Sequence, residues 1–432
     1  MPFETRRAAP KRIAVIGGGI SGLGAAHRLA GDHRVVLFEA ENRLGGHART
    51  VLAGKRGDQP VDTGFIVFNH VNYPHLTQLF DELGVPTAES EMSFGASIDG
   101  GRIEYGLASI RAIFAQKRNY VRPAFLKMVR DIVKFNKQAR GALAGPDMTI
   151  GELTYKLGLG DWFRDYYLAP FSGAIWSTPT TKILDFPAEA LVRFFENHAL
   201  MNYTDQHQWY TVQGGSVEYV RRLSDNLYSR GVDIRLSASV DAVRRTDVGA
   251  EVKLHGSEWE SFDEVIFATH SDDTLRMLSD ATGVERTALS AIRYQPNEAV
   301  LHCDETMMPK RKLCWSSWVY TEGKGESPDR IGLTYWMNSL QPIPHDDLHF
   351  VTLNNTRNIR EELIYDQATF RHPVYDVAAL AAQDTVRAIN GQRQTWFCGA
   401  WMKNGFHEDG LSSAVDVADA ILANKPVEIA AE

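Results

Sequence analysis

A glycine-rich turn between two apolar runs holds residues whose types and spacing point to nucleotide chemistry. Residues 13–16 form a short apolar run, which leads into three glycines with G-x-G-x-x-G spacing, Gly17, Gly19 and Gly22. A second apolar run, 34–38, ends on Glu39, 22 residues after Gly17. Strand, glycine turn, helix, strand and acidic residue in this order are typical of a dinucleotide-binding unit.

Each residue of this pattern has a physical role. Gly17 permits the sharp turn, Gly19 lets the backbone approach a pyrophosphate, and Gly22 lets helix and strand pack closely. The phosphates would rest on the helix N-terminus, where backbone N–H groups lack partners. The carboxylate of Glu39 would accept hydrogen bonds from a ribose hydroxyl.

The pattern continues beyond Glu39 as E-x-x-x-R-x-G-G, with Arg43, Gly45 and Gly46. Adjacent glycines allow the backbone to pass close to a second phosphate or a flavin ring, and Arg43 adds a fixed positive charge. Asp62-Thr63-Gly64 opens a further strand. Near the C-terminus, Phe397-x-Gly399 leads into Asp409-Gly410-Leu411 and a last helix, whose N-terminus would face an anionic cofactor edge.

At these residues the chain resembles the flavin-dependent amine oxidase superfamily, which includes monoamine oxidases, protoporphyrinogen oxidase and phytoene-type desaturases. The resemblance covers residues 11 to about 70, 205–270 and 390–425. It implies FAD as the cofactor and places a mid-chain backbone contact at Val240. The cofactor-binding residues that we predict are Gly17, Gly19, Ile20, Ser21, Gly22, Glu39, Ala40, Arg43, Gly45, Gly46, His47, Thr63, Gly64, Phe65, Val240, Gly399, Asp409, Gly410 and Leu411.

Two departures from the superfamily pattern bear on the substrate. His47 stands where the G-G-R element has its second arginine, and the segment around Gly405 lacks the paired aromatic residue expected of an amine-oxidase cage. The G-G-H and G-F-H-E-D-G elements are similar to those of a bacterial group of FAD proteins that includes fatty-acyl desaturases of furan fatty-acid biosynthesis. That likeness implies a methyl-branched acyl chain of membrane phospholipid as substrate.

His407 and Glu408 are the predicted catalytic residues. They lie beside the expected flavin turn, where an acid or base would move the proton that accompanies hydride removal from a carbon pair. The alternative is that both side chains fix the loop geometry or bind the ribityl chain, or that Glu408 and Asp409 simply place negative charge at a helix N-terminus. No metal site is expected, because the histidines and the three cysteines lack metal-ligand spacing.

The segment 110–140 is strongly basic within an acidic chain. It contains nine Lys or Arg and one acidic residue, Asp131, whereas the whole chain has a net charge of −8. Its apolar and cationic residues interleave with helical spacing, which suits the surface of an anionic membrane. The alternative is a substrate-domain helix with a solvated basic face and an apolar face in the core.

Length and composition define the class of protein. With 432 residues, 44% hydrophobic and 23% charged, the chain suits two folded domains. We find no apolar run of about 18 residues and no signal-like N-terminus, and the odd cysteine count makes structural disulfides unexpected. These features favour a cytoplasmic protein. Its basic segment 110–140 adds the hypothesis of peripheral contact with the inner face of the cell membrane. Nucleic acid is not an expected partner of so acidic a chain, and the sequence leaves the oligomeric state open.

The predicted fold is α/β, with a doubly wound, Rossmann-like FAD-binding domain interleaved with a second domain. We assign 1–100, 205–270 and 390–432 to the FAD-binding domain. The ranges 101–204 and 271–389 form a mixed-sheet and helical substrate domain. The predicted function is an FAD-dependent oxidoreductase that desaturates or oxidises a lipophilic substrate. One alternative is a flavin amine oxidase or protoporphyrinogen-type oxidase, and another is a non-enzymatic flavin-binding partner protein.

Overall fold

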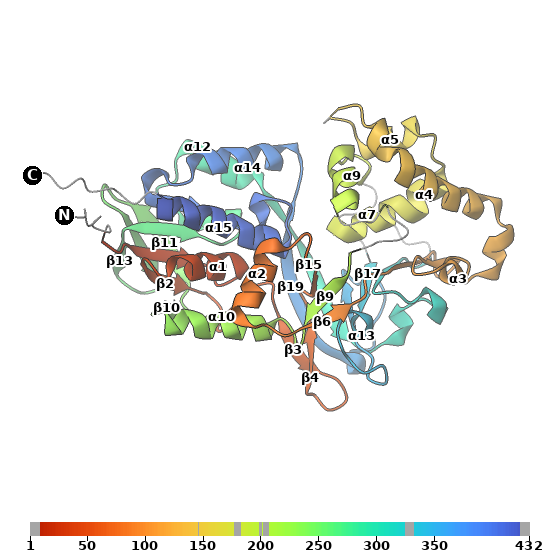
Figure 1. Cartoon of the computed structure of the whole chain (residues 1–432), viewed down its shortest axis with the longest axis horizontal. Helices are drawn as coiled ribbons and strands as arrows, with labels where there is room; N and C mark the ends of the chain where they lie inside the picture. Colours follow the sequence, from red (N-terminus) through yellow and green to blue (C-terminus); the bar gives the residue numbers. More distant parts are fainter. Residues whose placement is uncertain are drawn as a thin grey trace, which may run out of the picture.

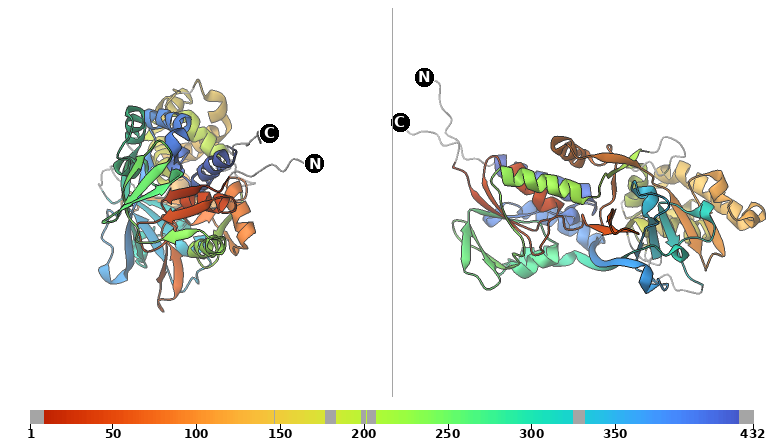
Figure 2. Two further views of the ribbon diagram at one scale, coloured as in Figure 1. Left: turned by 90° about the vertical axis from the view of Figure 1, so that its left-hand side faces the viewer. Right: turned by 90° about the horizontal axis from the view of Figure 1, so that it is seen from below.

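A computed structural model describes residues 9–145, 147–176, 183–197, 201, 207–324 and 332–423. It is an elongated molecule with a parallel sheet toward one end and a mixed sheet with a helical lobe toward the other (Figures 1 and 2). The parallel sheet has the strand order β10-β2-β1-β14-β20. Its strands are β1 (Arg12–Ile16), β2 (Arg34–Phe38), β10 (Asp233–Arg235), β14 (Glu264–Phe267) and β20 (Thr395–Phe397).

Both faces of this sheet are covered, because alternate residues of its buried strands point to opposite sides. Ile13 and Val15 pack into a core shared with helices on one face. These are α1 (Ile20–Leu29), α2 (Pro74–Leu83), α10 (Val217–Ser229) and α15 (His407–Ala423). Ala14 and Ile16 pack into a second core on the other face. That face carries β11 (Val240–Arg245), β12 (Ala250–Leu254), β13 (Trp259–Phe262), α11 (Ser271–Met277), α12 (Gly283–Ala291) and α14 (Val377–Ile389).

The seven-stranded sheet has the order β19-β15-β18-β17-β16-β7-β8, with only the β7–β16 pair parallel among its described strands. Its strands are β7 (Phe94–Ile98), β8 (Ile103–Gly106), β15 (Arg293–His302), β16 (Trp318–Thr321), β17 (Gly332–Trp336), β18 (Phe350–Leu353) and β19 (Ile364–Val374). The long strands β15 and β19 run back toward the parallel sheet (Figure 1).

A helical lobe shares one hydrophobic core with this mixed sheet. Its helices are α3 (Ile110–Ile113), η1 (Lys117–Val121), α4 (Pro123–Ala142), α5 (Ile150–Lys156), α6 (Asp161–Phe163), the π-helical turn η2 (Arg164–Leu168), α7 (Ala169–Trp176) and α9 (Ala188–Asn197). Phe125 and Phe135 of α4 are fully buried in the core. The segment 110–140, for which helical spacing is predicted, contains α3, η1 and most of α4.

Small sheets and turns connect the two ends. They comprise the hairpin β3 (Thr50–Ala53) with β4 (Gln59–Asp62), and the sheet of β5 (Val67–Phe68), β9 (Trp209–Val212) and β6 (Thr87–Ser90). The short helix α13 (Met337–Leu340) and the 3-10 turns η3 (Glu305–Met307), η4 (Lys312–Cys314), η5 (Glu361–Leu363), η6 (Gln392–Gln394) and η7 (Ala400–Met402) complete the described elements.

The parallel sheet with covered faces confirms the predicted α/β class. Its strands come from three separated stretches of the chain, so the sheet itself is interleaved in sequence. The distribution of elements differs from the predicted ranges at two places. Helices α11, α12 and α14 fall within 271–389 but pack on the parallel sheet, and β7 falls within 1–100 but pairs in the mixed sheet. Local periodicity identifies such elements without indicating which sheet they cover.

Candidate functional site

In the glycine turn between β1 and α1, Gly17 and Gly22 are tightly packed against other backbone atoms, whereas Gly19 faces open space. Gly17 has φ +109°, and its N–H donates to the carbonyl of Phe38 at 2.8 Å. A Cβ on Gly22 would lie 1.8 Å from the carbonyl oxygen of Gly17, so close helix packing requires glycine here. A Cβ on Gly19 would meet no other atom closer than 4.0 Å. The space beside Gly19 is therefore the place where a pyrophosphate would approach the backbone.

Glu39 faces this turn from the end of β2. Its Oε2 accepts a hydrogen bond from the N–H of Gly18 at 2.6 Å, and its Oε1 accepts one from the N–H of Glu41 at 2.8 Å. The carbonyl of Glu39 accepts from the N–H of Ala238, just before Val240 in β11. Val240 itself is buried, and Ala40 is exposed. The structure thus places the segment at Ala238–Val240 beside Glu39, the residue predicted to bind a ribose hydroxyl.

The second glycine pair lies directly on the first turn. Gly45 and Gly46 have φ +110° and +55°, and the N–H of Gly45 donates to the carbonyl of Gly18 at 2.8 Å. The guanidinium of Arg43 donates to the carbonyls of Gly46 and Ala48 at 3.0 and 3.2 Å. Arg43 therefore holds the conformation of this loop as well as supplying positive charge.

The segment after β4 is fixed by a buried carboxylate that sequence reasoning did not place in the site. Oδ1 of Asp62 accepts from the hydroxyls of Thr50 and Ser216 at 2.6 and 2.7 Å, and Oδ2 accepts from Nε2 of Gln341 at 3.0 Å. Burial raises the pKa of Asp62 to about 6, although these hydrogen bonds act in the opposite direction. The carboxyl ties three distant stretches together, and only its D-T-G context marks it in the sequence.

The predicted residues that follow Asp62 pass close to His47. The hydroxyl of Thr63 donates to the carbonyl of Arg49 at 3.3 Å. A Cβ on Gly64 would lie 1.9 Å from the carbonyl oxygen of His47, which accepts from the N–H of Phe65 at 2.9 Å. The glycine is therefore required by close backbone packing between these two segments.

The C-terminal element meets the glycine turn through two helix N-termini. A Cβ on Gly410, in the first turn of α15, would lie 2.9 Å from Oγ of Ser21 and 3.0 Å from Cγ2 of Ile20, in the first turn of α1. Leu411 packs against α1 beside Gly24, and Gly399 donates its N–H to Oγ of Ser413 at 2.9 Å. The N-terminal ends of α1 and α15 lie together here, and helix N-termini favour anionic groups such as a diphosphate. The residues present therefore fit a dinucleotide cofactor.

His407 and Glu408 have different surroundings. The imidazole of His407 stacks on the ring of Phe65, and its Nε2 lies 2.7 Å from the hydroxyl of Tyr219. Burial lowers the pKa of His407 to about 3, so the ring is neutral at physiological pH. Glu408 is buried, and its two carboxylate oxygens accept from the backbone N–H groups of His75 and Leu76 at 3.0 and 2.9 Å. Glu408 thus caps the N-terminus of α2, and a catalytic role for either residue stays a prediction.

A group of histidines surrounds His47 on its other side. The ring centroids of His270 and His372 lie 5.8 and 5.5 Å from that of His47. Burial lowers the pKa of all three imidazoles, to about 4 for His372. Nδ1 of His372 lies 2.6 Å from Nδ2 of Asn297 on β15. Where the superfamily pattern has an arginine, this chain has a cluster of neutral imidazoles.

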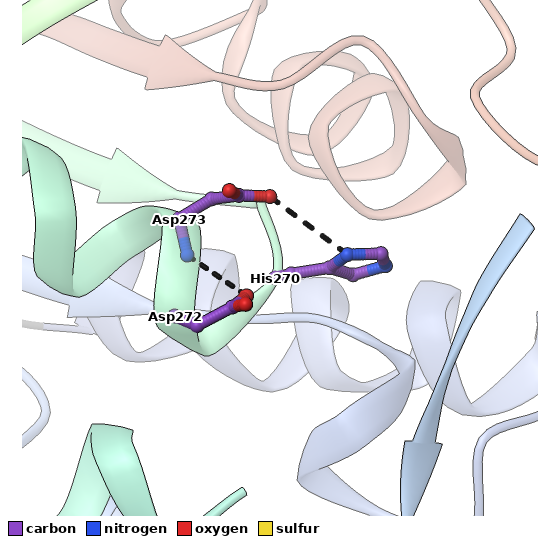
Figure 3. Close-up of side chains that lie close together, drawn as sticks. All are labelled: His270, Asp272 and Asp273. Atoms are coloured by element: carbon purple, nitrogen blue, oxygen red, sulfur yellow. Dashed lines mark hydrogen bonds and ion pairs between the residues drawn. The ribbon is translucent and has the colours of Figure 1, made fainter. Parts of the chain in front are cut away.

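His270 also lies near two carboxylates, a combination that metal ions favour (Figure 3). Nδ1 of His270 is 3.8 Å from Oδ2 of Asp273, and the N–H of Asp273 donates to Oδ1 of Asp272 at 2.9 Å. Arg371 forms ion pairs with both carboxylates, at 3.1 Å to Asp273. Because Arg371 pairs with both carboxylates and Arg276 pairs with Asp273 at 2.9 Å, the group forms an ion-pair network at the start of α11.

A cavity of about 220 Å³ lies between the helical lobe and the start of α15. Its wall is mainly apolar and includes Tyr73, Ile150, Phe186, Pro187, Ala190, Leu191, Tyr375, Leu380 and Phe406. The polar groups are Asn72, Arg193, Asn404, Glu408 and Asp409. Arg193 is exposed on α9 and is the only basic side chain of this lining.

Two aromatic residues of this wall come from separate elements. Tyr375 follows β19, and its hydroxyl donates to the carbonyl of Ala400 at 3.4 Å. A Cβ on Gly405, next to Phe406, would lie 2.8 Å from the Tyr375 hydroxyl oxygen. The G-F-H-E-D-G element does lack a second aromatic residue, but the fold supplies Tyr375 beside it. Sequence reasoning missed Tyr375, because its closeness to Phe406 depends on the path of β19.

Fold and site together define a two-part dinucleotide-binding flavoprotein. The model of the family described as flavin containing amine oxidoreductase matches residues 20–339, and the chain belongs to this family. The cofactor is FAD, and the protein is an FAD-dependent oxidoreductase of the amine-oxidase type. This confirms the predicted superfamily, cofactor and enzyme class.

The similarity to individual proteins is either confined to a short stretch of sequence or low in sequence identity. Coproporphyrinogen III oxidase of Mycobacterium tuberculosis (strain ATCC 25618 / H37Rv) is 41% identical over 80 residues, which are 18% of this chain and 17% of that protein. The structure of a CLA-producing fatty acid isomerase from P. acnes aligns with a TM-score of 0.69 and 16% identity, over 96% of this chain and 98% of the other. Cyclohexylamine oxidase from Brevibacterium oxydans IH-35A aligns with a TM-score of 0.68 and 14% identity, over 96% and 100%. These structures share the fold.

Proposed function

We propose that this oxidoreductase desaturates or oxidises a lipophilic substrate, a fatty-acyl chain of membrane phospholipid, with a methyl-branched chain as the preferred form. The observation that carries the proposal is the largely apolar cavity beside the start of α15. An acyl chain would gain free energy by leaving water for such a wall, at about 0.8 kcal/mol per buried CH₂ group. The shared fold with a fatty acid isomerase supports the same class of substrate.

The polar groups of the cavity suit an anionic lipid better than an ammonium ion. Both oxygens of Glu408 are occupied by backbone N–H groups, and Oδ2 of Asp409 accepts from the N–H of Phe406 at 2.9 Å. Burial raises the pKa of both carboxyls, which weakens their attraction for a cation. Arg193 offers the opposite charge, and a guanidinium binds carboxylate or phosphate oxygens in pairs.

Desaturation of a carbon pair removes one proton and one hydride, and FAD supplies the hydride acceptor when it is bound. The chain's own residues would position the substrate and handle the proton. The cavity wall would orient the acyl chain and exclude water, and Arg193 would hold its anionic group. The Phe65 ring fixes the plane of the His407 imidazole, and Tyr219 fixes its tilt. His407 would then present a neutral imidazole at a defined position for a hydrogen bond, because a pKa of about 3 makes it a weak base.

An amine or a porphyrinogen is the second candidate substrate. The aromatic pair Tyr375 and Phe406 favours it, since flat or cationic molecules bind between aromatic rings. The local match to coproporphyrinogen III oxidase points to the same alternative.

A panel of reductants under anaerobic conditions tests the proposal. The purified flavoprotein would be mixed with methyl-branched acyl phospholipid, straight-chain phospholipid, small amines and coproporphyrinogen, and flavin bleaching would be followed. We expect bleaching by the branched lipid within a single turnover. Rapid bleaching by an amine or the porphyrinogen, with none by either lipid, would overturn the proposal. A flavin that none of these compounds reduces would support a non-enzymatic flavin-binding role.

A further inference from the structure

An exposed tip of the helical lobe combines apolar and cationic side chains from two separate stretches of the chain. We define the docking tip as four apolar residues, Ile110, Tyr120, Val121 and Leu313, together with six cations, Arg111, Lys117, Arg118, Lys310, Arg311 and Lys312. The exposed fractions of the four apolar residues are 74%, 55%, 81% and 59%, in that order. Large apolar side chains this exposed are costly in water, so a group of them marks an interaction surface.

Contacts between short elements bring the two stretches together. Helix α3, which carries Ile110 and Arg111, packs against η4, which carries Lys312 and Leu313. The ring of Tyr120 stacks on Phe114 at the end of α3, with 4.4 Å between centroids and 16° between planes. These contacts hold the two stretches side by side, and α3 lies toward the end of the molecule opposite the parallel sheet (Figure 1).

The acidic groups near the tip are already neutralised. The Glu104 carboxylate is buried and pairs with Arg311 at 2.6 Å, and Glu305 pairs with Lys312 at 3.5 Å. Asp131 is buried against Lys127, and Asp99 pairs with Arg102. By contrast, Arg111 and Lys117 form no ion pair with any residue that the structure describes.

The structure also separates the docking tip from the rest of the basic segment. The apolar face of α4 is buried in the core of the lobe through Phe125, Met128 and Phe135. A helix whose apolar face is buried cannot lie flat in a bilayer interface. The prediction of an amphipathic membrane helix over 110–140 is thus replaced by a smaller surface at its beginning, extended by 310–313.

We infer that the docking tip binds the surface of an anionic lipid bilayer. Arg111 and Lys117, whose charges are not paired with a described acid, match the phosphates and negative headgroups. Ile110, Val121 and Leu313 would enter the boundary between headgroups and acyl chains. None of the helices among the described residues combines the length and apolar character that a membrane crossing requires. Behind the tip, α4 packs against α9, which lines the cavity. Docking therefore brings the cavity-bearing lobe to the lipid, and the inference stands whether or not the lipid is the substrate.

Co-sedimentation of the intact flavoprotein with vesicles tests the inference. One set of vesicles contains phosphatidylcholine alone, and the other contains phosphatidylcholine with one quarter phosphatidylglycerol. We expect binding to the anionic vesicles that weakens as salt rises. The double variant R111E/K117E should bind them roughly tenfold more weakly or worse, since each cation near the surface contributes on the order of 1 kcal/mol.

A second variant and a matched control test the contribution of the apolar side chains to vesicle binding. V121S/L313S should lose binding several-fold, whereas V248S/V377S, which removes two equally exposed valines near the parallel sheet, should bind like the wild type. All of these side chains are exposed, so flavin content and melting temperature should stay unchanged and report intact folding. Equal binding to both kinds of vesicle, no binding to anionic vesicles, or unchanged binding by both tip variants would overturn the inference. Binding to an acidic protein in place of lipid would appear as one of these failures.

Discussion

The imidazole of His407 lies stacked on the ring of Phe65, with 3.9 Å between the ring centroids and 12° between their planes. Phe65 follows the D-T-G segment, and His407 begins α15, so the contact joins two motifs more than 300 residues apart in sequence. It places the C-terminal element against the segment that follows β4, where the N–H of Phe65 donates to the carbonyl of His47 at 2.9 Å.

Two glycines of the turn have different roles: Gly19 is predicted to contact the cofactor, and Gly22 packs against the backbone of Gly17. Gly19→Ala should change the free energy of unfolding of the apoprotein by no more than about 0.5 kcal/mol, because its Cβ enters open space and its φ of −76° suits alanine. FAD affinity should nevertheless fall at least tenfold. Gly22→Ala is the contrast, since its Cβ would collide with the carbonyl of Gly17, and it should cost about 1–3 kcal/mol of stability. Flavin titration and denaturant unfolding measure both effects. Normal FAD affinity in Gly19→Ala would contradict this account of the turn.

Glu408 should contribute more to stability than to chemistry. Glu408→Ala removes the acceptor for two N–H groups at the start of α2 and should lower the free energy of unfolding by about 1–2 kcal/mol. Glu408→Gln keeps one acceptor oxygen and should recover part of that loss. The rate of flavin reduction by substrate should change less than tenfold in Glu408→Gln. A loss of a thousandfold with normal stability would instead make Glu408 catalytic.

His407 should act as a neutral group. Burial lowers its pKa to about 3, so the rate of flavin reduction should show no titration of this residue between pH 5 and 8. His407→Asn should reduce the rate about 100-fold if the imidazole accepts the substrate proton. Tyr219→Phe, which removes the hydroxyl near Nε2, should have a smaller effect on the same rate. An unchanged rate in His407→Asn would leave the ring with a purely structural role.

The histidine cluster should make the fold sensitive to acid. The pKa of His372 is about 4 in the folded chain and near 6.5 in the unfolded chain. Its contribution to stability is full above pH 6.5 and falls as the pH is lowered toward 4, because only the unfolded state then gains the proton. Between pH 8 and pH 5 this amounts to about 2 kcal/mol. Asp62, whose folded pKa is raised to about 6, changes stability in the opposite direction.

The variant His372→Asn removes the titration of His372 from the pH dependence of stability, and its amide keeps a hydrogen-bond partner for Asn297. Its melting temperature should fall less than that of the wild type between pH 8 and pH 5. Parallel pH profiles for the two proteins would show that His372 is not held neutral by the fold.

Arg193 should govern affinity for anionic substrates. Arg193→Ala should raise KM for an acyl lipid or free fatty acid about tenfold with little change in kcat, because the guanidinium binds a group remote from the reacting carbons. Arg193→Lys should recover part of the affinity. Arg140→Ala, which removes an exposed arginine on α4 that pairs with Glu196, serves as the control and should leave KM unchanged. An unchanged KM in Arg193→Ala would place the anionic group elsewhere.

The sequence was a good guide to the site wherever geometry is local. The glycine turn, Glu39 and the paired glycines form one motif because they are close in sequence, and in the structure Gly18 forms hydrogen bonds with both Glu39 and Gly45. The sequence predicts that Ser21 and Gly410 both bind the cofactor, but that they lie against each other follows only from the packing of α15 on α1. Two other contacts, Tyr375 with the Phe406 segment and Leu313 with α3, depend on the paths of strands and loops that are far apart in sequence. The periodicity of the sequence does not predict those paths. The tie between Asp62 and Gln341 spans 279 residues and has no local signature.

We propose that the cavity beside the start of α15 receives an acyl chain of membrane lipid. The lipids of a strain from which the gene has been deleted test it most directly, by extraction and mass spectrometry against the parent strain. We predict accumulation of an acyl chain that carries two more hydrogens than its product in the parent, and disappearance of that product. An unchanged acyl-chain profile, together with an accumulated amine or porphyrinogen, would contradict the account.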